Sequence, residues 1–191
     1  MIFGIDFDNT IVNYNLAFKK VIKKEKINLS KSLEKEKFDS KIQIRNYFLK
    51  NNDIDLWKKI QSKVYSKYIF EGYLNIEILK LLKYLDKKKI KFYIVSHKTI
   101  YPYFGKKINL HRLSKKWLRL NLFNLKNNFK KNYKSFFETT KKKKLNKIKL
   151  LKITHFIDDL DEILNLLPAN INKIKFNSLF KFNSIKKKYN I

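Results

Sequence analysis

Two carboxylates, at positions 6 and 8, are the residues of this sequence whose type and spacing most directly suggest chemistry. A short apolar run, residues 2–5, leads directly into Asp6 and Asp8. Such a run predicts a buried strand, and the two-residue period of a strand places both carboxylates on the same side of its end. Two like charges this close cost free energy unless a cation or a shared proton offsets them. The stretch therefore predicts a divalent metal and a reaction.

Two further apolar runs also end in polar side chains. The run at 90–95 is followed by Ser96, His97 and Lys98, and the run at 153–157 is followed by Asp158 and Asp159. In open α/β sheets, ligands bind at the carboxyl ends of the strands. If the three strands are neighbours, carboxylates, a hydroxyl and an ammonium group converge at one edge of the sheet. Oxygen ligands of this kind suit Mg²⁺, and the other groups can bind a phosphate.

The remaining segments supply the elements that must position these residues. Helical spacing of apolar residues occurs at 13–27, 41–50, 54–70, 75–88 and 111–123, and a helix capped by Thr139 or Thr140 is expected to run to about 151. Weaker patterns indicate a short strand at 135–137, a short helix before Pro168, a strand at 174–176 and a basic tail. Residues 28–40 are expected to connect elements, 99–110 to form a loop, and 124–134 are ambiguous.

The alternation of strands and helices predicts an α/β fold, a three-layer Rossmann-like parallel sheet covered on both faces. The block at 14–72 is too long for one crossover connection. We interpret it as a helical cap inserted after the first strand, with the helix at 75–88 as the true crossover. The predicted domains are a Rossmann-like catalytic core at 1–13 and 73–191, and the cap at 14–72.

Composition narrows the class of protein. With 191 residues, 44% of them hydrophobic and 15% aromatic, the chain can bury the core of one domain with a modest insertion. The absence of cysteine excludes disulfides and thiolate metal sites. The carboxylates interrupt the first apolar run, so no signal peptide is indicated, and no apolar stretch approaches the roughly 18 residues that span a membrane. We expect a cytoplasmic protein without a membrane partner; the sequence does not indicate its oligomeric state.

The formal net charge of +29 could indicate a surface for nucleic acid or an anionic membrane. Surfaces selected for phosphate backbones usually use arginine for bidentate contacts, yet Arg45, Arg112 and Arg119 are the only arginines in the sequence. The joint abundance of Lys, Asn and Ile favours an AT-rich coding sequence as the origin of the charge. A nucleic-acid partner is therefore an alternative and not the favoured prediction. The charge should still steer anionic substrates toward the protein.

The segment D-F-D-N-T at residues 6–10 resembles the D-x-D-x-T signature of the haloacid dehalogenase superfamily, whose members are mostly phosphatases. The other motifs of that family have candidates in the same order: Ser96, a lysine within 141–144, and the pair Asp158 and Asp159. The resemblance spans nearly the whole chain. The insertion at 14–72 is similar to the helical cap of that family, which restricts access to small substrates.

The resemblance implies roles for these residues. Asp6 would be the nucleophile that forms an aspartyl-phosphate, and Asp8 would protonate the leaving group and later activate water. Mg²⁺ would be held by Asp6, by the backbone carbonyl of Asp8 and by one carboxylate of the last pair, with Asp159 favoured over Asp158 as the direct ligand. Ser96 would act as a catalytic residue that donates a hydrogen bond to the phosphoryl oxygens. The other substrate-binding candidates are Thr10, Asn9, His97 and Lys98.

The resemblance also requires a lysine to balance the negative site. Lys144 and Lys141 share a helix face three residues apart, and one of these two is the candidate, with Lys144 favoured. A further acid expected after the last pair has only imperfectly spaced candidates in Asp161 and Glu162.

The sequence thus predicts a magnesium-dependent phosphomonoester hydrolase that acts on a small phosphorylated metabolite. One alternative is a phosphatase that processes nucleic-acid ends, which the basic charge favours and a closed cap disfavours. A second is a non-catalytic module that binds a phosphate ligand and has kept the fold. Dehalogenase chemistry is disfavoured, because Asp8 is a phosphatase feature of the superfamily.

Overall fold

The computed structural model describes residues 1–25, 41–122 and 133–191. The predicted connector at 28–40 lies outside the described residues, as does most of the ambiguous segment at 124–134. None of the helices in the described ranges has the length and apolar composition needed to span a bilayer.

The described chain divides into two compact units. The core unit comprises residues 1–13, 74–99 and 115–191, and the helical unit comprises residues 14–73 and 100–114. The segment 100–114, which follows the second apolar run and was expected to begin as a loop, therefore groups with the helical unit.

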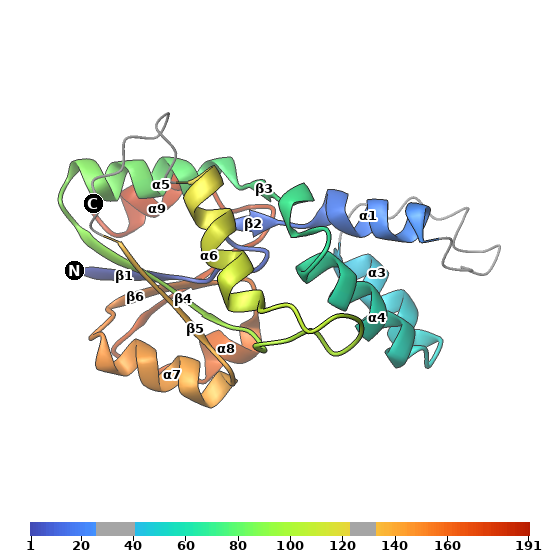
Figure 1. Cartoon of the computed structure of the whole chain (residues 1–191). Helices are drawn as coiled ribbons and strands as arrows, with labels where there is room; N and C mark the ends of the chain where they lie inside the picture. The colour runs from blue at the N-terminus through green and yellow to red at the C-terminus, as the bar shows by residue number, and fades with distance from the viewer. Residues whose placement is uncertain (26–40, 123–132) are drawn as a thin grey trace. The chain divides into compact units, whose positions relative to one another are not determined.

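The core unit is built on a five-stranded sheet in which every neighbouring pair is parallel. The strand order is β5-β4-β1-β6-β7, so β1 is central (Figure 1). The strands are β1 (Ile2–Ile5), β4 (Lys91–His97), β5 (Lys134–Glu138), β6 (His155–Asp158) and β7 (Asn172–Lys175). The run expected at 90–95 is thus a longer strand that includes Ser96 and His97.

Helices cover the sheet on both sides (Figure 1). On one side lie α5 (Ile76–Lys87) and α9 (Phe182–Lys188), and on the other lie α7 (Lys141–Leu150) and α8 (Asp161–Asn165). The helix α6 (Leu110–Asn121) belongs to the core unit from residue 115 onward. The predicted three-layer Rossmann-like arrangement is therefore confirmed.

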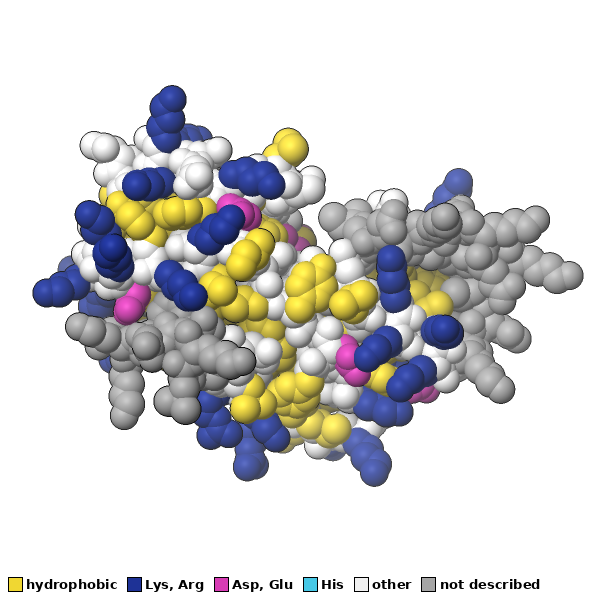
Figure 2. Space-filling view, turned by 90° about the horizontal axis from the view of Figure 1, so that it is seen from above, with side chains coloured by type: hydrophobic (Ala, Val, Ile, Leu, Met, Phe, Trp, Pro, Cys, Tyr) yellow, Lys and Arg dark blue, Asp and Glu magenta, His cyan; other side chains and the backbone are white. Residues whose placement is uncertain are grey.

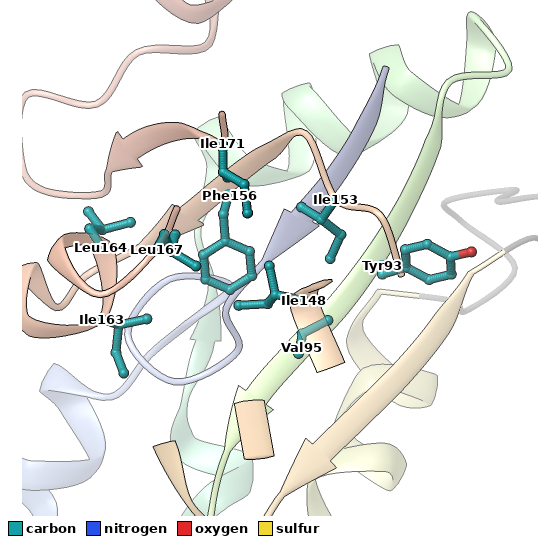
Figure 3. Packing of buried hydrophobic residues seen from close by; sticks show 9 residues of the cluster. All are labelled: Tyr93, Val95, Ile148, Ile153, Phe156, Ile163, Leu164, Leu167 and Ile171. Atoms are coloured by element: carbon teal, nitrogen blue, oxygen red, sulfur yellow. The ribbon is translucent and has the colours of Figure 1, made fainter. Parts of the chain in front are cut away.

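One apolar layer packs β4 and β6 against α7 and α8, as Figure 3 shows. Its buried residues are Tyr93, Val95, Ile148, Ile153, Phe156, Ile163, Leu164, Leu167 and Ile171. Gly4 of β1 lies against the Phe156 ring, and a Cβ atom at Gly4 would be 2.5 Å from a carbon of that ring and 2.7 Å from Ile153. Glycine at this position therefore permits close packing of β1 beneath the Phe156 ring.

The basic C-terminal segment, for which no element was expected, forms α9. The Phe182 ring packs 5.4 Å from the Tyr84 ring of α5, and the Phe182 N–H donates to Glu77 Oε2 at 2.8 Å. Ile185 is buried. Packing against α5, rather than local apolar periodicity, stabilises this short helix.

In the described residues, the helical unit contains α1 (Asn15–Lys24), α3 (Lys41–Lys50), α4 (Ile54–Tyr65), the short 3₁₀ turn η1 (Ile69–Glu71) and the first residues of α6. Its core includes stacked aromatic rings: the centre of the Trp57 ring of α4 lies 5.4 Å from that of Phe18 and 6.4 Å from that of Phe48. The 100–114 segment joins this unit partly through Phe104, whose N–H donates to Ser62 Oγ at 3.1 Å.

Two short strands, β2 (Val12–Asn13) and β3 (Tyr73–Leu74), form a separate two-stranded sheet. They lie where the chain passes from the core unit to the helical unit and back. At two residues each, they are too short to leave a recognisable period-two pattern in the sequence.

Candidate active site

The candidate site lies at the carboxyl ends of three adjacent strands. β1 is hydrogen-bonded to β4 on one side and to β6 on the other. Asp6 continues β1, since its N–H donates to the carbonyl of Ile157 at 2.9 Å. The neighbouring strands end in His97 and Asp158, so the arrangement that the sequence analysis required is present in the fold.

A tight turn after β1 carries the rest of the D-x-D-x-T segment. The N–H groups of Ile11 and Val12 both donate to the carbonyl of Phe7, at 3.1 and 3.0 Å. Asn9 adopts a left-handed conformation with φ of 59°, which asparagine tolerates better than most residues. Thr10 is fully buried, and its Oγ1 has no hydrogen-bond partner among the described residues. A buried hydroxyl of this kind is a potential donor to a ligand.

Three carboxylates gather at this edge of the sheet. Asp6, Asp158 and Asp159 each offer a ligand atom within 4.8 Å of the others. Asp6 and Asp158 are buried, whereas Asp159 is half-buried. Asp158 also closes the turn that follows β6, because its Oδ1 accepts the N–H of Leu160 at 2.9 Å. These residues form the carboxylate cluster.

Lys144 lies in this cluster and Lys141 does not. The Lys144 Nζ, fully buried, is 2.5 Å from Asp6 Oδ1 and 2.6 Å from Asp158 Oδ2. The exposed Lys141 instead pairs with Glu162 at 2.6 Å. Thr140 caps α7, as its Oγ1 accepts the N–H of Lys143 at 3.2 Å. This cap sets the start of the helix and thereby the face on which Lys144 lies.

A second ion pair lies beside the cluster. The Lys98 Nζ is 2.8 Å from Asp8 Oδ1 and 2.7 Å from Asp8 Oδ2. Lys98 was expected to bind substrate, and the sequence contains no signal for its pairing with Asp8. The Asp8 carboxylate is not part of the set of acidic ligands that could hold a metal among the described residues.

The other two residues at the end of β4 lie at the same edge. Ser96 is almost fully buried, and His97 is half-buried. Burial lowers the pKa of His97 below its ordinary value, and the ammonium group of Lys144 adds to this effect. The lowered pKa favours the neutral ring, in which one nitrogen donates a hydrogen bond and the other accepts one, according to the tautomer.

The two acids that follow Asp158 and Asp159 form ion pairs with lysines outside the carboxylate cluster. Asp161 Oδ2 is 2.6 Å from Lys175 Nζ, and Glu162 pairs with Lys141. Lys175 of β7 also donates to the backbone carbonyl of Asp159 at 2.9 Å. The loop after β6 is thus held by a lysine that the motif pattern did not identify.

The electrostatics of the site favour an added cation. Burial raises the pKa of the Asp6 carboxyl well above its ordinary value; Asp158, Asp159 and Asp8 raise it further, and Lys144 opposes them. The three carboxylates of the cluster and the ammonium group of Lys144 together carry a formal charge of −2. A divalent cation would neutralise it, and closely spaced carboxylate oxygens are the ligands that Mg²⁺ prefers. The residues present therefore fit this ion.

No protein-family model matches the sequence, and no curated protein matches it significantly. Solved structures do match. A HAD-superfamily hydrolase from Ehrlichia chaffeensis aligns with a TM-score of 0.54 and 17% identity, covering 98% of this chain and 94% of that chain. A hydrolase from Streptococcus pneumoniae TIGR4 aligns with a TM-score of 0.55 and 14% identity, covering 100% and 98%. The chain therefore has the fold of the haloacid dehalogenase superfamily hydrolases.

Proposed function

We propose that the protein is a magnesium-dependent phosphomonoester hydrolase that acts through an aspartyl-phosphate on a small phosphorylated metabolite. The observation that carries this proposal is the gathering of Asp6, Asp158 and Asp159 around Lys144 at the carboxyl edge of the sheet. The description of the two structural neighbours as hydrolases supports the same class of reaction.

In the first step an oxygen of the Asp6 carboxylate attacks the phosphorus atom. The bond between phosphorus and the leaving oxygen breaks, and its electron pair stays on that oxygen, which takes a proton from Asp8. Lys144 holds the Asp6 side chain through the contact with Oδ1. The product of this step is a phosphorylated Asp6 and a free alcohol.

In the second step Asp8, now ionised, takes a proton from a water molecule whose oxygen attacks the phosphorus. The bond between phosphorus and the Asp6 oxygen breaks and returns the Asp6 carboxylate, releasing inorganic phosphate. Asp8 regains its proton in this step, so Asp6 ends ionised and Asp8 ends protonated, as each began.

Mg²⁺ would be held by Asp6, by the backbone carbonyl of Asp8 and by Asp159. Both oxygens of Asp158 already accept hydrogen bonds, from Lys144 and from the Leu160 N–H, and this favours Asp159 as the direct ligand. When bound, the ion neutralises negative charge on the phosphoryl group.

Donors for the phosphoryl oxygens are available beside these residues. The candidates are the Thr10 hydroxyl, which lacks a protein partner among the described residues, the Ser96 hydroxyl and the His97 ring. Asn9 lies in the same turn as Thr10. We propose that the helical unit, which includes the predicted cap at 14–72, limits the site to small substrates.

The test is a panel of phosphomonoesters incubated with the purified protein and MgCl₂. We expect release of phosphate from at least one metabolite and from p-nitrophenyl phosphate, with no release in EDTA. Asp6→Asn is the matched control, because it keeps the shape of the side chain and removes the nucleophile. A protein that binds a phosphate analogue but hydrolyses nothing on the panel would instead support the non-catalytic alternative.

A second candidate, a phosphatase for nucleic-acid ends, is favoured by the net charge of +29. Figure 2 shows lysine and arginine side chains at several separate places on the face that it draws. Binding to a phosphorylated oligonucleotide that weakens steeply with salt, together with faster hydrolysis of that end than of any metabolite, would support the second candidate.

A further inference from the structure

The ion pair between Lys98 and Asp8 is fixed from several directions. The Lys98 side chain is only 3% exposed, and its ammonium group contacts both oxygens of Asp8. Its backbone N–H donates to the Glu138 carbonyl at 2.7 Å, which continues the ladder between β4 and β5. The ammonium group also lies 5.9 Å from the centre of the Phe7 ring. Lys98 is therefore held in place by the core unit itself.

The Asp8 carboxylate lies outside the carboxylate cluster. Asp8 lies two residues from Asp6, yet its carboxylate is not in the set of Asp6, Asp158 and Asp159 that could hold a metal within the described part of the chain. A divalent cation at that cluster would attract any nearby carboxylate. A contact through both of its oxygens with a buried ammonium group opposes that attraction.

We propose that Lys98 is a positioning residue that acts through Asp8: it keeps the Asp8 carboxylate out of the metal-binding set and oriented for proton transfer. This proposal rests on the proposed function, since it needs Asp8 to exchange protons with the leaving group and water. It replaces the role in substrate binding predicted for Lys98 from the sequence. Lys144 holds the nucleophile Asp6, and Lys98 holds the acid–base residue Asp8, so each buried lysine positions one of the two reacting carboxyl groups.

A double-mutant cycle tests whether Lys98 acts through Asp8. The variants are Lys98→Met, Asp8→Asn and the double variant, assayed with p-nitrophenyl phosphate, whose good leaving group keeps the Asp8→Asn rate measurable. General acid–base catalysis contributes about 10²–10⁴-fold, so Lys98→Met is expected to lower kcat on p-nitrophenyl phosphate by about 10²-fold, because Asp8 still activates water in the second step. In the Asp8→Asn background the same substitution should have almost no further effect.

Three additional measurements separate positioning from other roles. KM of Lys98→Met should stay within about threefold of the wild-type value, as expected when ground-state binding is kept. The thermal shift on adding MgCl₂ should remain, and Lys98→Arg should recover part of kcat. Lys91→Met is the matched control, because Lys91 begins β4, the strand that Lys98 follows, is exposed, and has its Nζ 5.5 Å from the centre of the Tyr93 ring.

Multiplicative losses in the double variant, or a large rise in KM, would overturn the proposal and return Lys98 to substrate binding. Loss of the thermal shift with MgCl₂ would also overturn the proposal, because it would mean that Lys98 is needed for metal binding. Should Lys98→Met not fold, Lys98→Gln takes its place in the cycle. Failure of the proposed function is seen separately, as the absence of turnover by the wild-type protein.

Discussion

The Nζ of Lys144 lies between two buried carboxylates, 2.5 Å from Asp6 and 2.6 Å from Asp158. The ammonium group joins the ends of two neighbouring strands to α7, and its side chain has no exposed surface. Buried charges are tolerated only when they are paired. Removing any one of these three residues therefore leaves an unbalanced buried charge. The contact with Lys144 also holds Asp6, the proposed nucleophile, in place.

Lys144→Met is expected to remove activity and to destabilise the fold, because it leaves Asp6 and Asp158 without their shared cation. Breaking a buried pair typically costs about 3–5 kcal/mol, measurable by urea denaturation in EDTA. Lys141→Met is the matched variant on the same helix, and because its pair with Glu162 is exposed, the cost should be about 1 kcal/mol or less. Equal effects of the two substitutions would contradict the assignment of Lys144.

The metal-free protein should lose stability with rising pH because of Asp6. Its pKa is raised above the ordinary 3.8, chiefly by burial, so the folded state holds this proton more tightly than the unfolded chain. The stabilisation is fully present below the ordinary value and is lost as pH rises through the folded pKa. Asp6→Asn cannot ionise, and in EDTA its free energy of unfolding should fall less than that of the wild type between pH 5 and pH 8.

Added Mg²⁺ should stabilise the wild-type protein more than it stabilises Asp6→Asn. A ligand at about 100 times its dissociation constant stabilises the fold by about 2.7 kcal/mol, and Asp6→Asn should gain much less because a ligand is missing. Thermal unfolding with and without MgCl₂ measures the difference. An equal gain in both proteins would mean that Asp6 does not bind the ion.

The residues that gather at the strand ends could be predicted because a parallel sheet brings its carboxyl edges together. Asp6, Asp158 and Ser96 each follow or end an apolar run, and helix geometry reduced four consecutive lysines to Lys144 and Lys141. The sequence could not choose between these two with certainty, since the rotation of α7 relative to the sheet depends on its packing.

Other features depend on contacts between segments that the sequence does not relate. The pairing of Lys98 with Asp8 joins residues 90 positions apart. The helix α9 was missed because lysines dominate its sequence, and the contacts of Phe182 with Tyr84 and Glu77 stabilise it. Likewise, no local pattern assigns the 100–114 segment to the helical unit.

Gly4→Ala should destabilise the core unit. The added methyl group would lie 2.5 Å from a carbon of the Phe156 ring, which is itself fully buried. Overpacking of this kind typically costs about 1–3 kcal/mol. Phe156→Leu should be less harmful in the Gly4→Ala background than in the wild type, because the smaller side chain relieves the clash. Additive losses in urea denaturation would show that the two sites do not share this space.

His155 should make stability depend on pH in the opposite sense to Asp6. Its ring stacks on Phe3 at 4.8 Å, and its Nδ1 and Nε2 lie 2.9 Å from Thr154 Oγ1 and 3.1 Å from Asn172 Nδ2. Burial lowers the pKa of His155 below its ordinary 6.5, and the terminal ammonium group adds to this effect. The unfolded chain therefore binds this proton more readily than the fold.

The contribution of His155 is fully present above the ordinary pKa and is lost as pH falls through the folded pKa. His155→Phe keeps an aromatic ring against Phe3 but cannot titrate, so its free energy of unfolding should fall less than the wild-type value between pH 7 and pH 5. Some slope should remain, because burial also lowers the pKa of His97. Paired urea denaturation curves across this range measure the difference. Identical slopes in the two proteins would show that His155 accepts a proton in the folded state as readily as in the unfolded chain.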